Sequence, residues 1–394
     1  MLAALPWDLA PHLPWSPLTS PAAQWEVMPS FLVGEYLFYA CTILAFVHAR
    51  RHGRAHLLAW VAALLAGTAN DMLFMALPMV DNFWQAQATI MLTPRLPLYI
   101  PCVYVCFMYF PTVAVWRLGL PRIAQAALTG LLAELFYAPY DIVGAKFLWW
   151  TWHDTDMPIA NRLLGVPVGS SMWVITFVAG FAFLLATGLR KDPEVERRST
   201  IAKALALVMG LSSLQMMVQM RPLQLLDEGI PGPRGLVVVI VIYLGVVVWG
   251  LRRRQPPSPR RASDRPLLVA AILYYLTLAG IMAIADPTAH RSASMHQTYG
   301  ECHVEATDIM GLTRYEFLCA QDFDEDFDFR CVDHLPAAGD EWYTVCGRAH
   351  TDLARFMMVM ALLSALGIAA YGTLLSDRLR SSGRGSEPSS NATH

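Results

Sequence analysis

Nine long apolar segments constrain this 394-residue chain more than any other feature. A helix that crosses a bilayer needs about 20 mainly apolar residues, because each residue rises about 1.5 Å across a hydrocarbon core about 30 Å thick. The segments of suitable length are 29–49, 56–79, 96–116, 120–140, 167–189, 200–220, 235–251, 266–285 and 353–375. The sequence therefore predicts an all-α, polytopic transmembrane bundle of about nine helices.

The composition agrees with a membrane environment. Only 15% of the residues are charged, whereas soluble domains have about 25%. No strongly basic domain is present, which argues against nucleic-acid binding. The expected partners are membrane lipids, and nothing in the sequence identifies a protein partner.

The distribution of Lys and Arg predicts the orientation of the bundle. These residues concentrate in the connections after the first, third, fifth and seventh segments and in the C-terminal tail. By the positive-inside rule those parts are cytoplasmic, so the N-terminus is extracytoplasmic. The predicted units are an extracytoplasmic tail (1–28), an eight-span bundle (29–285), an extracytoplasmic loop (286–352), a ninth span (353–375) and a disordered cytoplasmic tail (376–394).

Four of the seven cysteines lie in the loop 286–352, namely Cys302, Cys319, Cys331 and Cys346. An even number of cysteines indicates disulfides in an oxidising lumenal or extracellular compartment. Three pairings are possible, and pairing between sequence neighbours is preferred, giving Cys302–Cys319 and Cys331–Cys346.

Carboxylic acids inside the predicted spans are the first functional signal. Ionisable groups there cost a few kcal/mol each, and they usually mark functional sites. Asp71 and Glu134 lie deepest, while Glu35 and Asp141 lie nearer the outer ends, where a purely structural role is the alternative. Glu134 and Asp141 are two helical turns apart and share a face with Tyr137. Because all four acids fall in the extracytoplasmic half, we predict that they line one cavity open to that side.

The segment KFLWWTWHDTD (146–156) adds a histidine, two acids and three tryptophans at the same level. It is interpreted as part of the same site, the alternative being a capped turn beneath interfacial tryptophans. The candidate catalytic residues are Asp71, Glu134, Asp141, His153, Asp154 and Asp156. The candidate substrate-binding residues are Glu35, Asn70, Arg95, Tyr137, Lys146, Trp149, Trp150 and Trp152.

Such a set of residues suggests acid–base chemistry on a lipid. Several carboxyl groups in a low dielectric cannot all stay ionised, and a neutral acid beside an ionised one is suited to general acid–base catalysis. One reaction of this kind is protonation of an alkene, with aromatic faces stabilising the carbocation. Alternatively, His153, Asp154 and Asp156 hold a divalent metal such as Mg²⁺, Mn²⁺ or iron. Two further hypotheses remain open: a proton- or cation-coupled transporter, and a non-catalytic receptor or assembly protein.

A second histidine pattern, His48, His52 and His56, lies at the end of the first span. Gly53 interrupts it, and three arginines at 50, 51 and 54 surround it. It is therefore interpreted as a cationic cytoplasmic turn rather than as a metal site.

The sequence resembles a family of multi-pass membrane proteins with no established activity. That resemblance rests on the segments 146–156 and 81–100 and on the four-cysteine loop with EWYTVCG (341–347). Residues 35–189 more distantly resemble the membrane carotenoid hydratase and cyclase family. In that family an acid precedes a Trp-x-Trp segment and Gly-Val-Pro opens the next helix, which correspond here to Asp141, 150–152 and 165–167. This resemblance implies acid-catalysed hydration or cyclisation of an isoprenoid.

Overall fold

The computed structural model describes residues 15–77, 83–153, 156–256, 262–307, 311–319 and 327–376. Within these ranges, each of the nine predicted segments forms a helix long and apolar enough to cross a membrane. These helices are α2 (Pro29–His52), α3 (Arg54–Ala76), α4 (Tyr99–Trp116), α5 (Arg122–Lys146), α6 (Val168–Leu189), α7 (Arg198–Gln224), α8 (Pro233–Leu251), α9 (Arg265–Ile284) and α10 (Leu353–Leu375). The chain is therefore a multi-pass membrane protein.

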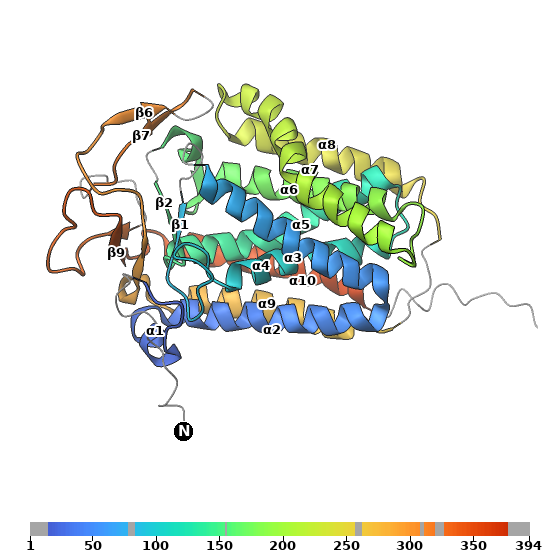
Figure 1. Cartoon of the computed structure of the whole chain (residues 1–394), viewed down its shortest axis with the longest axis horizontal. Coiled ribbons are helices and arrows are strands. Elements are labelled where there is room, and N and C mark those ends of the chain that lie inside the picture. Colours follow the sequence, from blue (N-terminus) through green and yellow to red (C-terminus); the bar gives the residue numbers. More distant parts are fainter. Residues whose placement is uncertain are drawn as a thin grey trace, which may run out of the picture.

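Helix α4 lies at the centre of the bundle, whereas α8 and α10 lie at its edge. Over the apolar 18-residue window of each helix, 89% of α4 is buried, against 22% of α8 and of α10. Figure 1 shows the long helices running side by side, with all strands gathered at one end of the bundle. Helices that are apolar on every side suit both places, because lipid and a protein core are alike apolar solvents.

Helix α5 ends at Lys146 rather than at Tyr140, so the predicted end of this span was wrong. Pro139 lies inside the helix and has no N–H to donate to the carbonyl of Leu135. The hydroxyl of Tyr275 in α9 donates to that carbonyl instead, at 3.0 Å. Because a neighbouring helix supplies the missing donor, the helix continues through the proline.

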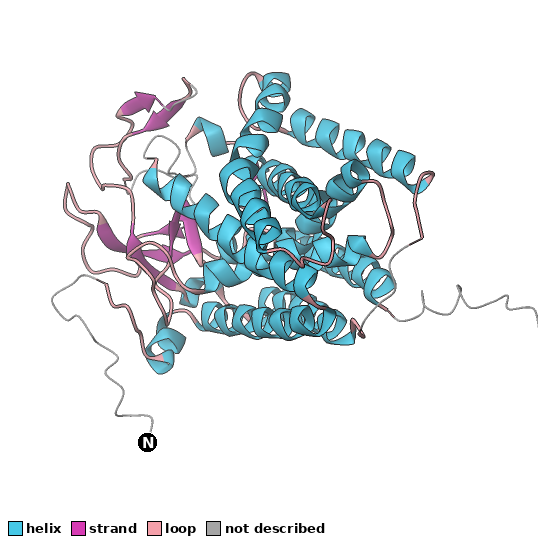
Figure 2. Cartoon of the chain, turned by 45° about the vertical axis from the view of Figure 1, so that its right-hand side comes forward, coloured by secondary structure: helices cyan, strands magenta, loops and turns pink. Residues whose placement is uncertain are grey.

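The loop between α9 and α10 folds into a small β-rich cap at the strand end of the bundle (Figure 2). Its three-stranded antiparallel sheet has the order β5 (Arg291–Met295), β9 (Trp342–Gly347), β8 (Phe327–Asp328). A separate antiparallel pair consists of β6 (Glu305–Thr307) and β7 (Thr313–Tyr315). The all-α prediction therefore holds for the membrane region and is wrong for this cap.

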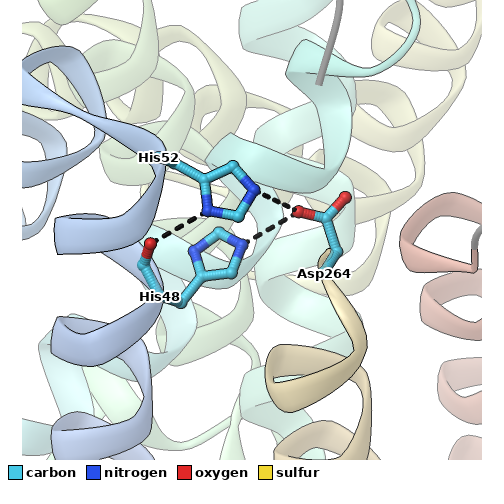
Figure 3. Close-up of side chains that lie close together, drawn as sticks. All are labelled: His48, His52 and Asp264. Atoms are coloured by element: carbon cyan, nitrogen blue, oxygen red, sulfur yellow. Dashed lines mark hydrogen bonds and ion pairs between the residues drawn. The ribbon is translucent and has the colours of Figure 1, made fainter. Parts of the chain in front are cut away.

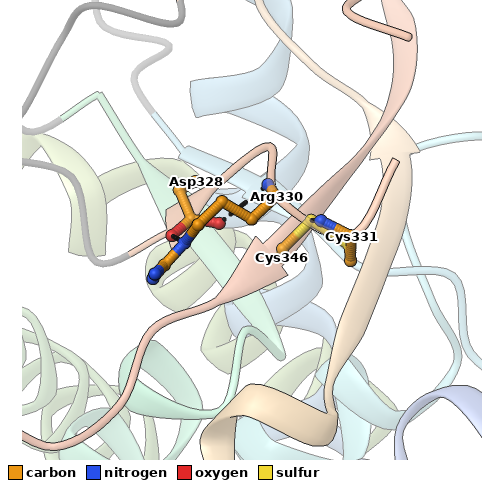
Figure 4. The surroundings of a disulfide bond; sticks show 4 residues. All are labelled: Asp328, Arg330, Cys331 and Cys346. Atoms are coloured by element: carbon orange, nitrogen blue, oxygen red, sulfur yellow. Dashed lines mark hydrogen bonds and ion pairs between the residues drawn. A yellow bond between two sulfur atoms is a disulfide. The ribbon is translucent and has the colours of Figure 1, made fainter. Parts of the chain in front are cut away.

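Two disulfides staple the cap, and they are the preferred pairs Cys302–Cys319 and Cys331–Cys346. The second joins β9 to the turn after β8, beside an exposed ion pair in which Arg330 Nε lies 2.5 Å from Asp328 Oδ2 (Figure 4). A domain this small buries little apolar surface, so covalent links compensate for a limited core. The predicted pairing is confirmed.

Short elements lie before α2 or in the connections between the long helices. They are α1 (Pro21–Val27), β1 (Phe83–Gln85), β2 (Trp150–Trp152), β3 (Arg162–Leu163), β4 (Val166–Pro167) and the 3₁₀ turns η1 (Met157–Ile159), η2 (Leu225–Asp227) and η3 (Pro287–Ala289). β1 and β2 pair antiparallel, which joins the connection after α3 to the connection after α5. The cap then docks on both, since Gln87 N donates to Ala293 O at 2.9 Å and the Thr151 hydroxyl lies 3.3 Å from His296 Nδ1.

Candidate functional site

A cavity of about 390 Å³ lies at the strand end of the bundle, between α3, α4, α5, α6, α7 and the strands β1 and β2. Most of its lining is apolar or aromatic, and the large rings are Tyr104, Phe107, Tyr137, Tyr140, Trp150 and Trp173. The volume falls in the range of small-molecule sites, which is about 300–1,000 Å³. Of the predicted site residues, six line this cavity: Asn70, Asp71, Tyr137, Trp150, Trp152 and Asp156.

Asp71 lies on the α3 wall and accepts a hydrogen bond at the end of a chain of neutral side chains. The Tyr104 hydroxyl donates to Asp71 Oδ1 at 2.8 Å, and Asn70 Nδ2 donates to the same hydroxyl at 3.4 Å. Ser213 of α7 donates to Asn70 Oδ1 at 2.8 Å. Gly67 makes this arrangement possible, because a Cβ there would lie 2.1 Å from Cγ of Tyr104. The network joins α3, α4 and α7 around one buried carboxyl group.

Asp141 does not line the cavity itself but contacts a residue that does. Ser170, which lines the cavity, donates to Asp141 Oδ2 at 2.5 Å. Glu134, which lies seven residues before Asp141 on the same helix, does not line the cavity. The structure thus brings Asp71 and Asp156 to the cavity directly and Asp141 through a serine.

Asp156 closes the cavity on the side of the cap and carries a counter-ion that the sequence analysis missed. Its Oδ1 accepts from Tyr315 N at 2.9 Å and lies 3.1 Å from His153 Nδ1. Its Oδ2 lies 3.6 Å from Nε of Arg314, a cap residue. Asp154, which was predicted together with His153 and Asp156 as a possible metal ligand, lies outside the described residues. Because Arg314 is 158 positions from Asp156 in sequence, no local pattern could have paired them.

Two predicted substrate-binding residues have structural partners away from the cavity. Glu35 is fully buried and accepts from the Thr89 hydroxyl at 2.6 Å and from the Tyr39 hydroxyl at 2.7 Å. Trp149 donates to the Ser30 hydroxyl at 3.1 Å. Both residues fasten α2 to the segments that surround the cavity.

Arg95 and Lys146 were predicted as substrate-binding residues, and neither lines the apolar cavity. Lys146 Nζ instead donates to Ala349 O at 3.3 Å, where it anchors the start of α10. Arg95 lines a second hollow of about 420 Å³ between the cap and the connection after α3. Arg314 lines both hollows, so the apolar cavity adjoins a polar one. His296 lies in that polar hollow, where burial and the charge of Arg95 lower its pKa to about 3.

The α3 and α7 walls of the cavity reach the outer surface of the bundle. Leu77 and Met217 line the cavity and are nevertheless 38% and 39% exposed. Met216 and Met220 lie beside Met217 in the lining. Methionine side chains are flexible and adapt to irregular apolar shapes. At these two walls the cavity lining reaches the exposed surface of the bundle.

Two tryptophans of the lining have unsatisfied polar groups. The indole nitrogens of Trp152 and Trp173 are buried and have no hydrogen-bond partner among the described residues. An unpaired buried donor costs about 1–3 kcal/mol. Such a donor beside a cavity is explained by a bound acceptor, either water or a ligand oxygen.

The opposite end of the bundle holds a buried cluster that the sequence analysis interpreted wrongly. His48 and His52 are 1% and 4% exposed, and both converge on Asp264 (Figure 3). They are not part of a solvated cationic turn, although the nearby arginines at 50, 51 and 54 are exposed. Their spacing of four residues, which puts both rings on one helix face, was the available signal. The acid that completes the cluster is 212 positions further along the chain.

Comparison with known proteins identifies a family but no activity. A family model described as a domain of unknown function (DUF7802) matches residues 15–374. No curated protein and no solved structure matches the chain.

Proposed function

Because the chain belongs to the DUF7802 family, a domain of unknown function, we propose a function from the cavity itself. The protein binds the apolar part of a membrane lipid in the cavity and acts on it as an acid–base enzyme. The carrying observation is that the carboxyl groups of Asp71 and Asp156 lie in the wall of one largely apolar cavity.

Three features support a lipid as the substrate. The cavity is apolar, and its α3 and α7 walls reach the lipid-facing surface at Leu77 and Met217. The adjoining cap hollow supplies two arginines, Arg95 and Arg314, next to which a polar head group fits. The unpaired indole donors described above suit an oxygen on the bound molecule.

The proposed reaction is hydration or isomerisation of a carbon–carbon double bond, with an isoprenoid as the substrate. Asp71 in its neutral form gives a proton to one alkene carbon, and the π electron pair forms the new C–H bond. The neighbouring carbon becomes cationic, and the aromatic faces of Tyr104 and Trp173 stabilise it. In hydration a water oxygen bonds to that carbon and returns a proton to the carboxylate. In isomerisation an adjacent C–H returns it.

We also propose that the cap faces an oxidising lumenal or extracellular compartment. Its two disulfides and the concentration of Lys and Arg in the connections at the opposite end support this orientation. The N-terminus is then extracytoplasmic and the C-terminus cytoplasmic.

The test compares membrane lipids from cells that express wild type, Asp71→Asn or Asp156→Asn. Asp192→Asn is the control, because it changes a buried acid outside the predicted catalytic set that does not line the cavity. Both cavity variants are expected to shift the lipid profile while the control does not. Unchanged profiles in both cavity variants at normal protein levels would contradict the proposal.

Transport is the second candidate, and one observation favours it. Buried ionisable groups lie at both ends of the bundle, as a relay for protons or cations requires. Proton or cation flux in vesicles reconstituted with the purified chain distinguishes transport from catalysis. Flux that is present in wild type and lost in Asp71→Asn would support transport in place of the enzyme proposal.

A further inference from the structure

The cluster at the opposite end of the bundle joins α2 to the start of α9. His48 Nε2 lies 2.9 Å and His52 Nε2 lies 3.1 Å from the same atom, Asp264 Oδ1. All three side chains are at most 1% exposed. Among the residues that the structure describes, this is the one group of three metal-competent side chains whose ligand atoms lie within 4.8 Å of one another.

The hydrogen bonds of His52 fix which ring nitrogen carries its proton. Nδ1 lies 2.9 Å from the carbonyl oxygen of His48, which can only accept, so Nδ1 bears the hydrogen. In the neutral ring, Nε2 then has a lone pair. That lone pair faces two further acceptors, Asp264 Oδ1 and the carbonyl of Ala262 at 3.2 Å. Something positive must lie between them, either a proton on Nε2 or a metal ion.

Counting the groups around Asp264 Oδ1 favours a metal ion over a proton. Arg117 Nη2 also donates to Oδ1, at 2.7 Å. If both histidines were protonated at Nε2, three N–H donors would crowd onto Oδ1 alone. A metal ion bound by both nitrogens and by Oδ1 takes one lone pair and leaves the other for Arg117.

The second ring, His48, can present the same lone pair. Its Nδ1 lies 2.7 Å from the Tyr109 hydroxyl, which can accept as well as donate. When Nδ1–H donates to that oxygen, Nε2 is free to bind a metal. A ligating histidine commonly donates its other N–H to a carbonyl or similar acceptor, and both rings meet that condition.

We propose that His48 Nε2, His52 Nε2 and Asp264 bind one divalent transition-metal ion, with Zn²⁺ preferred. Two imidazoles and one carboxylate are typical zinc donors, and ligand atoms in a tetrahedral zinc site lie about 3.3 Å apart. The observed separations of 2.9 and 3.1 Å need only a small adjustment. Arg117 acts as the outer partner that orients the carboxylate. The metal staples α2, α9 and the end of α4, far from the cavity and independently of its proposed function.

The first experiment measures the metal content of the full-length, tag-free chain purified in detergent, by elemental analysis after exposure to Zn²⁺ and dialysis. Wild type is expected to retain about one Zn²⁺ per chain. His52→Gln and Asp264→Asn are expected to weaken binding at least tenfold. His56→Gln is the matched control, because His56 belongs to the same stack of rings but not to the ligand set, and it should keep the metal. Wild-type protein that retains no Zn²⁺ would overturn the proposal.

A second measurement uses wild type alone, in case Asp264→Asn does not fold. Loading the chain with Co²⁺ is expected to give the intense visible absorption of a four-coordinate site, and Zn²⁺ should displace it. Adding Zn²⁺ to chelator-treated protein should also raise its melting temperature. A chain with no Co²⁺ absorption and an unchanged melting temperature carries a protonated cluster instead, and the proposal fails.

Discussion

The two ends of the helical bundle treat buried acids in opposite ways. At the cap end, Asp71 and Asp141 accept hydrogen bonds from the neutral hydroxyls of Tyr104 and Ser170, beside a cavity. At the other end, Asp264 is surrounded by a guanidinium and two imidazoles. Asp71 can exchange a proton with a bound molecule because it lines the cavity, whereas Asp264 contacts charged and ring groups that belong to other helices. Burial alone therefore does not identify a functional acid, and neither does the charge of its partners, because Asp156 faces Arg314 and also lines the cavity.

The largest effect on stability should come from the compensated acid. Asp264→Asn leaves the buried guanidinium of Arg117 without its countercharge, and breaking a buried ion pair costs about 3–5 kcal/mol. The free energy of unfolding, measured in detergent, is expected to fall by that amount. Asp328→Asn removes an exposed ion pair and should cost less than about 1 kcal/mol. Equal losses in the two variants would mean that Asp264 does not organise its end of the bundle.

A methyl group at Gly67 should disturb the cavity end next most strongly. In Gly67→Ala the new Cβ would lie 2.1 Å from Cγ of Tyr104, so the ring must move away from Asp71. Overpacking of this kind costs about 1–3 kcal/mol. Gly210→Ala is the control, because no atom lies within 4 Å of its added Cβ and alanine suits a helix interior better. Thermal unfolding of both variants tests this contrast, which fails if Gly67→Ala melts like wild type.

The cap should lose stability as the pH falls. The pKa of His296 is lowered from 6.5 to about 3 in the folded chain, mainly by burial and further by Arg95. Between these values the unfolded chain binds more protons, so stability is complete above about pH 6.5 and declines toward pH 3. The slope is at most about 1.4 kcal/mol per pH unit for this one group. Hydrogen exchange of the β5 and β9 amides at pH 7 and pH 5 measures the decline, and His296→Gln should reduce it. A pH-independent wild type would contradict this assignment.

The smallest effect on stability is expected from the acid proposed to be functional. Asp71→Asn keeps a carbonyl oxygen for the Tyr104 hydroxyl, so the free energy of unfolding should change by less than about 1 kcal/mol. The lipid profile should nevertheless change, as proposed above. A loss of stability as large as that of Asp264→Asn would erase the difference between the two ends.

The membrane helices could be predicted from the sequence because apolar length is a local property. The end of α5 could not, since the hydroxyl that rescues the helix at Pro139 comes from Tyr275 on another span. The residues of the cavity could be predicted only in part, for the same reason. Asp71 was identified by its depth in one helix and Tyr137 by the helix face that it shares with two acids, but Arg314 reaches Asp156 only through the folded cap. The role of Asp264 likewise becomes visible only in the folded structure, where it contacts histidines more than two hundred positions away.

The three-residue strand β2 is shared between the cavity and the cap. Trp150 and Trp152 point to one side and line the cavity, and Thr151 points to the other, toward His296. Because the strand has only three residues, its backbone cannot rotate the side chains on one face without also moving those on the other face. A displacement of the cap at His296 is therefore expected to move the two indole rings in the cavity wall as well.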